Sequence, residues 1–323
     1  MGVALFALGG TIATSGADDA MPSLTAEDLL AAVPGLAEAG IALEAYDLVR
    51  LPGAAMTFDH VLAVAAAAAE RVATGTSGVV VTQGTDTIEE TAYALDLLWA
   101  ERAPLVVTGA MRQPTMAGAD GPANLLAAIQ TAAAPAARDL GCLVVLNDEV
   151  HAARWVRKTH TTSTGAFASP GAGPIGSLAE GRLLLRARPP RRRAVGPLSG
   201  PVTVRTAVVP MVLDDDGTLL RQAAAACDGL VVAGFGVGHV PMSIVDVLAG
   251  VADRLPVVLA SRVGTGPVLA NTYAFPGSES DLLGRGLIGA GTLDAYKARV
   301  LLHLLLAGGA DREAIAAAFR DHG

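Results

Sequence analysis

Short apolar runs alternate with alanine-rich stretches of helical character along the first 150 residues of the chain. The runs are apolar at successive positions, so both faces of each strand would be buried. Such strands, separated by helices, are typical of a parallel sheet that is covered on both sides. The pattern predicts strands at 3–8, 42–49, 78–82, 104–108 and 142–147, and helices at 25–33, 57–74, 87–101 and 120–133.

The pattern changes in the second half of the chain. Residues 165–186 combine apolar positions with glycine turns, which favours a β-hairpin, and the segment 188–201, rich in proline and arginine, is typical of an exposed linker. We therefore predict an α/β fold of two domains: a larger N-terminal parallel-sheet three-layer domain at 1–187 and a smaller C-terminal Rossmann-like α/β domain at 202–323. The second domain has predicted strands near 204–210, 229–234 and 256–260, and helices near 241–252, 292–306 and 311–320.

Charge and composition argue against several classes of partner. The net charge of −8 disfavours a nucleic-acid partner. No apolar run approaches the ~20 residues that span a membrane, and the N-terminal segment, which lacks a basic n-region, is expected to form the first strand rather than a signal peptide. Cys142 and Cys227 have neither the spacing of a disulfide framework nor that of a metal site. We expect no bound metal and a reducing, cytoplasmic location.

Polar turns directly follow several of the predicted strands. The most informative is TQGTDT at 82–87, in which Thr85 and Asp86 place a hydroxyl beside a carboxylate. A helix N-cap needs one such residue, and this turn has four. The C-terminal ends of parallel strands line the ligand crevice of an open sheet, so turns at these ends should converge on one pocket. The turns expected to meet there are 9–11, 82–87, 109–112, 147–148 and 157–159.

The residues available in such a pocket favour a threonine nucleophile. The chain has no G-x-S-x-G elbow and no G-x-x-x-x-G-K-[ST] loop, and the glycines at 234–238 form a weak dinucleotide pattern because His239 occupies a position that needs glycine. A threonine needs a base, and lysine can serve when burial disfavours its charged form. The chain has 23 basic residues, of which only Lys158 and Lys297 are lysines. We expect Lys158 to be the base and Lys297 to have a solvated stem on a helix.

Several segments closely resemble the bacterial-type L-asparaginase family, which includes the glutaminase-asparaginases. The resemblance covers nearly the whole chain and implies hydrolysis of the side-chain amide of L-asparagine to L-aspartate and ammonia, without a cofactor. The segments that carry it are ALGGTIAT (7–14), VVVTQGTDTIEETAYALDLL (79–98), PLVVTGAMR (104–112), ADGPANLLAAI (119–129), KTHTT (158–162) and the tail segments 291–293 and 297–302.

The resemblance implies a role for each matching residue. Thr11 would be the nucleophile that forms a β-acyl-enzyme. Thr85, Asp86 and Lys158 would form a second triad, in which Asp86 also binds the substrate α-amino group. Backbone N–H groups around Thr85 and Ala110 would hold the amide and its developing oxyanion. The implied substrate-binding residues are Gly10, Gly53, Ala54, Gly84, Ala110, His239 and Glu279.

The resemblance also implies an oligomer. The family is typically a homotetramer built of intimate dimers, in which the second domain of a neighbour completes each site. We therefore expect a homodimer or homotetramer of this chain with its sites at the dimer interface. Residues 234–239 and Glu279 would be contributed by the neighbour.

Three positions depart from the family pattern. The loop at 15–30 lacks the tyrosine that assists the nucleophile, and Ala20 is the closest position in alignment. The segment 53–55 lacks the serine and the further polar residue that bind the substrate α-groups, and His239 replaces an asparagine. Two alternatives therefore stay open: an amidase acting on glutamine or another amide, and a relative that binds an amino acid without turnover. An archaeal-type tRNA-dependent amidotransferase subunit is not expected, because it normally has an additional N-terminal domain.

Overall fold

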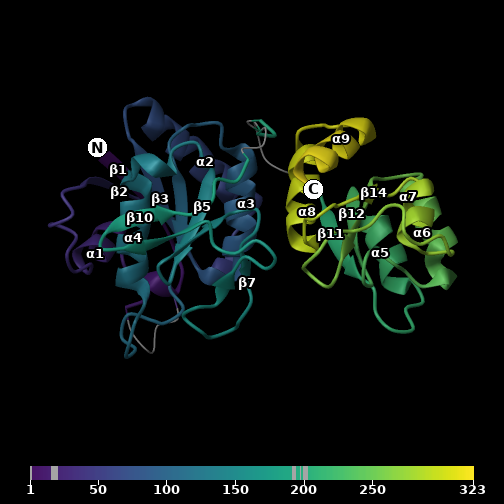
Figure 1. The fold of residues 1–323 in the computed structure, drawn as a ribbon, viewed down its shortest axis with the longest axis horizontal. Helices are drawn as coiled ribbons and strands as arrows, with labels where there is room; N and C mark the ends of the chain where they lie inside the picture. Colours follow the sequence, from purple (N-terminus) through teal and green to yellow (C-terminus); the bar gives the residue numbers. More distant parts are fainter. Residues whose placement is uncertain (1, 16–20, 191–193, 197, 199–202) are drawn as a thin grey trace. The chain divides into compact units, whose positions relative to one another are not determined.

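The computed structural model describes residues 2–15, 21–190, 194–196, 198 and 203–323. The chain separates into two compact units, Met1–Gly196 and Pro197–Gly323 (Figure 1). The predicted linker at 188–201 spans the boundary between the units, and its residues 191–193, 197 and 199–201 lie outside the described residues.

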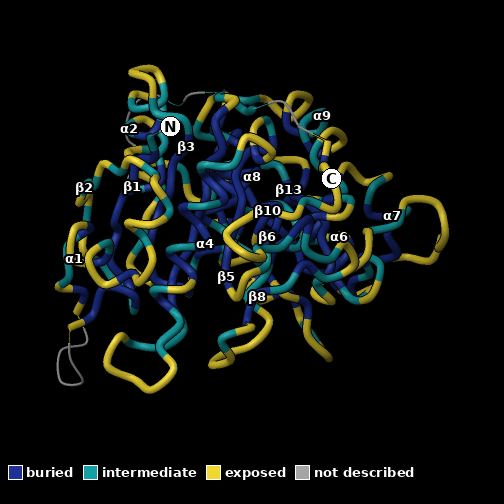
Figure 2. The backbone as a smooth tube through the Cα atoms, turned by 60° about the vertical axis from the view of Figure 1, so that its left-hand side comes forward, coloured by how far each residue is buried: buried dark blue, intermediate teal, exposed yellow. Residues whose placement is uncertain are grey.

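Unit 1 is built on an eight-stranded sheet with the strand order β10-β9-β6-β5-β4-β3-β1-β2. Neighbouring strands from β2 to β5 run parallel, as the sequence predicts. Residues of the central strands are almost fully buried (Figure 2), because helices cover both faces. The parallel strands are β1 (Gly2–Gly9), β2 (Ala42–Leu51), β3 (Gly78–Thr82), β4 (Leu105–Thr108) and β5 (Cys142–Leu146).

The remaining three strands of this sheet are antiparallel, so the sheet is mixed and not parallel throughout. Asn147 and Asp148 join β5 to β6 as a two-residue turn with φ values of 52° and 58°, which is the backbone of a type I′ hairpin. So short a connection cannot cross over to a parallel position. The predicted hairpin at 165–186 is confirmed in its second half. These strands are β6 (Glu149–Ala152), β9 (Gly176–Ala179) and β10 (Arg182–Leu185).

The helices of unit 1 lie on the two faces of the sheet, which gives three layers (Figure 1). Leu125 and Ile129 of α4 pack with Val80 and Val106 of the sheet in one apolar core, to which α1 adds Leu29. Helices α2 and α3 cover the opposite face (Figure 1). The helix bounds are α1 (Ala26–Ala31), α2 (Phe58–Ala73), α3 (Ile88–Leu98) and α4 (Gly121–Ala133), and a separate two-stranded ribbon is formed by β7 (Arg157–Lys158) and β8 (Phe167–Ala168).

Unit 2 has a four-stranded parallel sheet in the order β11-β12-β13-β14. The predicted strands of this region are confirmed, whereas the short helices α5 and α7 and the strand β14 were not predicted from the apolar pattern. No described helix of either unit is long and apolar enough to cross a membrane. The elements are β11 (Thr206–Pro210), α5 (Thr218–Ala226), β12 (Gly229–Gly234), α6 (Val245–Ala252), β13 (Val257–Ser261), α7 (Glu279–Gly284), β14 (Ile288–Gly289), α8 (Ala295–Ala307) and α9 (Arg312–His322).

The prediction of a solvated stem for Lys297 is wrong. This side chain is fully buried near the start of α8, and its Nζ donates to Asp294 Oδ2 at 3.1 Å. Asp294 is also the N-cap of α8 and accepts the backbone N–H groups of Tyr296 and Lys297. The capping carboxylate compensates the buried ammonium, so the helix can take a lysine into its apolar face.

Candidate functional site

The C-terminal ends of three neighbouring strands of unit 1 are level with one another. Ala7 of β1 lies opposite Thr82 of β3, and Thr82 lies opposite Thr108 of β4. The polar turns that follow these strands therefore leave the sheet at one edge. This register brings together the turns that carry Thr11, Thr85 and Ala110.

Three glycines allow the Thr11 turn and the Gly53 turn to pack closely against the Thr85 turn. A methyl group on Gly10 would lie 2.1 Å from the backbone nitrogen of Gly84, and one on Gly53 would lie 2.6 Å from the Gly84 carbonyl oxygen. Both distances are far below van der Waals contact, so only glycine permits this backbone approach. Gly10 also has a φ of 82°, in the region that favours glycine. The contact between Gly10 and Gly84 places the Thr11 turn beside the Thr85 turn.

Lys158 meets both side chains of the Thr85–Asp86 pair. Its Nζ donates to Thr85 Oγ1 at 2.9 Å and to Asp86 Oδ1 at 3.0 Å. The Lys158 side chain is 17% exposed and that of Asp86 is 61% exposed, so the ion pair reaches from a half-buried position to solvent. A lysine that is hydrogen-bonded to a hydroxyl can exchange a proton with a reactant through that hydroxyl.

The Thr85 turn is organised as part of a site and not as a helix cap. Residues Thr85–Thr87 form a single 3-10 turn, and Thr87, the N-cap of α3, makes no capping hydrogen bond with its side chain. Instead Gln83 Nε2 donates to Thr87 Oγ1 at 3.3 Å, and Thr87 Oγ1 donates to the Gly53 carbonyl at 2.8 Å. This chain of hydrogen bonds ties the end of β3 to the Gly53 turn. Sequence reasoning missed Gln83 and Thr87 as supports, although both lie inside the polar turn it singled out.

Thr11 begins a second 3-10 turn, Thr11–Ala13, directly after Gly10. Thr14 Oγ1 donates to the Thr11 carbonyl at 2.9 Å and closes the turn. The chain returns to this turn after the loop, because the backbone N–H groups of Ser23 and Leu24 both donate to Ala13. Ala20, the position expected in place of the family tyrosine, lies outside the described residues.

The loop that carries Ala110 is held by two residues that the sequence did not single out. Asp120 accepts the backbone N–H groups of Met111 and Arg112, and Asn124 Nδ2 donates to the Gly109 carbonyl at 3.0 Å. Asp120 immediately precedes α4 and Asn124 lies in its first turn. The sequence signal for these two supports is an acidic and an amide side chain, Asp120 and Asn124, four residues apart at the start of an apolar helix.

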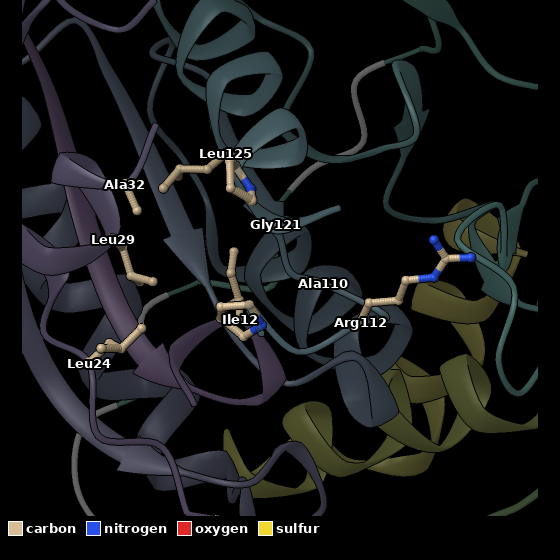
Figure 3. Close-up of a pocket in the computed structure, with 10 residues that line it drawn as sticks. Ile12, Leu24, Leu29, Ala32, Ala110, Arg112, Gly121 and Leu125 are labelled. Atoms are coloured by element: carbon tan, nitrogen blue, oxygen red, sulfur yellow. The ribbon is translucent and has the colours of Figure 1, made fainter. Parts of the chain in front are cut away.

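Two cavities adjoin this edge of the sheet. An open groove of about 620 Å³ is lined by Asp86, Lys158, Thr159, His160 and Thr161. The second is an apolar cavity of about 40 Å³ beside the Thr11 turn, where Ile12 and Ala110 face Leu24, Leu29 and Leu125 (Figure 3). The second cavity has room for little more than a water-sized group and few polar partners, so we regard it as a packing gap. The groove beside Lys158 is the one that can admit a substrate.

Sequence comparison assigns both units to known domain families. Residues 2–191 match the asparaginase N-terminal domain, and residues 205–319 match the glutaminase/asparaginase C-terminal domain. The chain belongs to the asparaginase family of amidohydrolases. The resemblance found in the sequence is thereby confirmed, and with it the two-domain α/β fold.

Three proteins of this family are similar to the chain over nearly their whole length. A probable L-asparaginase of Deinococcus radiodurans is 38% identical over 323 residues, covering 98% of this chain and 96% of the relative. L-asparaginase 2 of Escherichia coli is 36% identical over 332 residues, covering 99% and 93%. The crystal structure of a probable cytoplasmic L-asparaginase from Campylobacter jejuni superposes with a TM-score of 0.87 at 31% identity, and covers 99% of each chain.

The Gly53 turn, expected to lie at the substrate site, carries no polar side chain. Residues Gly53–Ala55 form a 3-10 turn in which Gly53 is buried against Gly84, while Ala54 and Ala55 are exposed. Their side chains offer only methyl groups, so polar contacts from this turn are limited to its backbone. Gly53 and Gly84, expected to bind substrate, have a packing role in the described structure. A substrate-binding role for these residues stays a prediction.

His239 and Glu279 form a pair within unit 2. Glu279 has no exposed surface: Oε1 accepts the N–H groups of Thr272 and Tyr273, and Oε2 lies 3.2 Å from His239 Nε2. Burial of this carboxylate would raise its pKa, but the N–H groups of Tyr273, Glu279 and Thr272, together with His239, hold the pKa below its usual value. Phe275 and Tyr273 meet the imidazole edge-on at 5.0 Å. His239, with its side chain 23% exposed, is therefore the accessible member of the pair.

Proposed function

We propose that this chain hydrolyses the side-chain amide of L-asparagine to L-aspartate and ammonia through an acyl-enzyme on Thr11. The single observation that carries the proposal is the contact of Lys158 Nζ with Thr85 Oγ1 and Asp86 Oδ1, on a turn that Gly10 and Gly84 hold beside Thr11. Membership of the asparaginase family and the similarity to L-asparaginases support the same reaction.

The reaction divides between the two turns. Thr11 Oγ attacks the amide carbon, its proton passes to the departing nitrogen, and the C–N bond breaks to release ammonia and leave an ester on Thr11. Water then attacks the ester, with Lys158 in its neutral form accepting a proton through the Thr85 hydroxyl, and aspartate leaves as the proton returns to Thr11. Backbone N–H groups near Thr85 and Ala110 stabilise the oxyanion that develops in each step.

Asp86 is the natural partner of the substrate α-amino group. Its carboxylate is bonded to Lys158 through one oxygen, and the side chain is 61% exposed at the groove. The α-carboxylate then lies toward the Gly53 turn, where backbone groups must replace the polar side chains that the family usually supplies. Loss of a side-chain partner for a charged group weakens binding by roughly 1–3 kcal/mol.

A second candidate is a related amidase that accepts glutamine or another small amide. The methyl-only side chains of Ala54 and Ala55 favour this alternative, because a wall without polar groups constrains the substrate less. A glutaminase-asparaginase of Pseudomonas aeruginosa is 30% identical over 313 residues. A third possibility, a relative that binds an amino acid without turnover, is disfavoured because Thr11, Thr85, Asp86 and Lys158 are all present.

We propose in addition a homodimer or homotetramer, with His239 of unit 2 reaching the site of a neighbouring copy. Such an interface would cover four exposed apolar side chains of unit 2. These are Val212, Leu213, Met242 and Val263. The mass in solution, measured by light scattering across a dilution series, tests it; a monomer at all concentrations would refute it.

The cytoplasm is the proposed location. Both cysteines are free thiols, and burial raises the pKa of the Cys142 thiol well above its usual value, which suits an unreactive structural cysteine. The Campylobacter jejuni structure is described as cytoplasmic, whereas a relative from Haemophilus influenzae is described as periplasmic. Cell fractionation with antibody detection distinguishes the two compartments.

Ammonia release from L-asparagine, L-glutamine and a panel of simple amides tests the proposed activity. We expect turnover of L-asparagine, with Thr85→Val reducing it to near background while the circular dichroism of the protein is unchanged. Faster turnover of glutamine or another amide would transfer the assignment to the second candidate. No turnover of any amide by the wild-type protein would refute both.

A further inference from the structure

The strand that carries Lys158 lies outside the main sheet. Strands β7 and β8 have two residues each and pair only with one another, Lys158 opposite Phe167 and Arg157 opposite Ala168. A two-stranded ribbon is marginal by itself. The position of the Lys158 ammonium therefore depends on what fastens this ribbon to the rest of unit 1.

Polar contacts fasten the ribbon at both strands. On β7, the backbone N–H of Lys158 donates to Glu89 Oε2 at 2.8 Å, and Glu89 lies in the first turn of α3. Directly after β8, Ser169 Oγ lies 2.9 Å from His151 Nδ1, and His151 belongs to β6 of the main sheet. The second contact links the β8 side of the ribbon to strand β6 of the main sheet.

His151 is built into the sheet as a neutral imidazole. It has no exposed surface, and burial lowers its pKa below the usual value although the nearby Glu149 carboxylate opposes this shift. His151 Nε2 is buried 3.4 Å from Glu149 Oε2 and makes no hydrogen bond to a described residue. The hydrogen bond of this imidazole is the one at Nδ1, 2.9 Å from Ser169 Oγ.

We propose that the Ser169–His151 contact, with Glu149 beside the imidazole, positions the β7–β8 ribbon so that Lys158 Nζ stays within reach of Thr85 and Asp86. His151 and Ser169 are thus positioning residues for proton transfer, and this inference rests on the proposed function of Lys158. The three residues have the composition of a hydrolytic triad. Ser169 is only 4% exposed and His151 is 0% exposed, so a substrate cannot reach the serine and a second hydrolytic site is excluded.

Unit 2 offers a matched control pair. His303 is also a buried histidine, and its Nδ1 lies 3.1 Å from Thr206 Oγ1. This pair joins α8 to β11 and belongs to none of the elements that carry Thr11, Thr85 or Lys158. Removing a hydroxyl from either pair deletes one buried hydroxyl–imidazole contact, but only one of them touches the ribbon.

The test compares Ser169→Ala with Thr206→Val in steady-state hydrolysis of L-asparagine. We expect Ser169→Ala to lower kcat roughly 10- to 100-fold with little change in KM, because a misplacement of about 1 Å in a reacting group can cost about 10²-fold. Thr206→Val should leave kcat within about twofold while both lower the melting temperature to a similar extent. His151→Leu should resemble Ser169→Ala, and His151→Asn should recover part of kcat because its amide can reach the position of Nδ1.

A crystal structure of Ser169→Ala provides the second measurement. The proposal predicts that Lys158 Nζ moves beyond hydrogen-bond distance of Thr85 Oγ1. Unchanged kcat together with an unmoved Lys158 would overturn the proposal even if the wild-type protein is an active asparaginase. If the wild-type protein lacks amidase activity, the proposed function fails, and the displacement of Lys158 in the crystal still decides whether Ser169 and His151 position it.

Discussion

The two lysines of the chain are each paired with an aspartate at nearly the same distance, yet their surroundings differ. Lys158 Nζ lies 3.0 Å from Asp86 Oδ1, and Lys297 Nζ lies 3.1 Å from Asp294 Oδ2. The side chains of the first pair are 17% and 61% exposed, whereas those of the second are 1% and 9% exposed. The distance between charges therefore does not tell a reactive lysine from a structural one.

The origin of each pair separates their roles. Asp294 and Lys297 are three residues apart at the start of one helix, so the pair forms whenever α8 forms. Lys158 and Asp86 are 72 residues apart and meet only when the β7–β8 ribbon is fastened to unit 1. Lys158 also shares the Thr85 hydroxyl and lines an open groove. The long-range contact with Asp86, the hydrogen bond to Thr85 and the exposure to the groove together favour a catalytic role for Lys158 over a structural one.

Replacing Lys158 should have the largest effect on turnover. We expect Lys158→Met to lower kcat for L-asparagine by about 10²–10⁴-fold, the usual contribution of a general base, while the free energy of unfolding changes little. Ammonia release and denaturant unfolding measured on the same preparation check both parts. A kcat within threefold of the wild type would remove Lys158 from the mechanism.

The same substitution at Lys297 should lower stability and leave turnover almost unchanged. Lys297→Met leaves the buried carboxylate of Asp294 without its ammonium partner, so we expect the free energy of unfolding to fall by roughly 3 kcal/mol. At a temperature where the variant is folded, kcat should stay within about twofold of the wild type. A large loss of kcat in fully folded Lys297→Met would show that the division between the two lysines is mistaken.

The helix that carries Lys297 also contains a pH-sensitive group. Burial, and the nearby Arg299 cation, lower the pKa of His303 to about 4. In the unfolded chain His303 has its ordinary pKa of about 6.5 and so binds the proton more tightly than in the folded protein. The contribution of neutral His303 to the free energy of unfolding is therefore fully present above pH 6.5 and falls as the pH drops toward 4. The loss at pH 4.5 should be roughly 1–3 kcal/mol. Denaturant unfolding at pH 7 and pH 4.5 should show a smaller loss for His303→Gln; an equal loss in both proteins contradicts the assignment.

Substitutions in the Gly53 turn should have the smallest effect. Ala54→Ser adds a hydroxyl where Ala54 is exposed, and we expect the KM for L-asparagine to fall by a few-fold, or about 1 kcal/mol. Gly53→Ser should lower activity instead, because its Cβ would lie 2.6 Å from the Gly84 carbonyl. Steady-state kinetics on both variants decide the matter. An unchanged KM for Ala54→Ser would place the α-carboxylate away from this turn.

Local patterns predicted the parts of the molecule that local chemistry determines. The continuous apolar runs at 78–82 and 229–234 match β3 and β12, and the polar residues that follow β3 do contact Lys158. The apolar pattern did not show that Asn147 and Asp148 reverse the chain. A polar turn after a strand is expected both at a ligand site and in a hairpin. Nor could the apolar pattern show the burial of Glu279, since its charge is compensated by backbone N–H groups that only the folded chain supplies.

The residues proposed to position Lys158 could not be predicted from the sequence. Glu89, His151 and Ser169 lie 69, 7 and 11 residues from Lys158, and nothing in their spacing relates them to it. Their relation to the site arises from strand pairing and from the packing of α3 beside the ribbon. Such contacts depend on tertiary structure, whereas the glycines at 10 and 84 were visible in the motifs.

Trapping of the intermediate tests the central claim most directly, namely that Thr11 carries the acyl group and Lys158 completes the proton transfer. Lys158→Met is mixed with L-asparagine, quenched in acid and digested, and the peptides are analysed by mass spectrometry. We predict an aspartyl ester on the peptide that contains Thr11, absent when Thr11 is replaced by valine. An ester on Thr85, or wild-type turnover by Thr11→Val, would contradict the account.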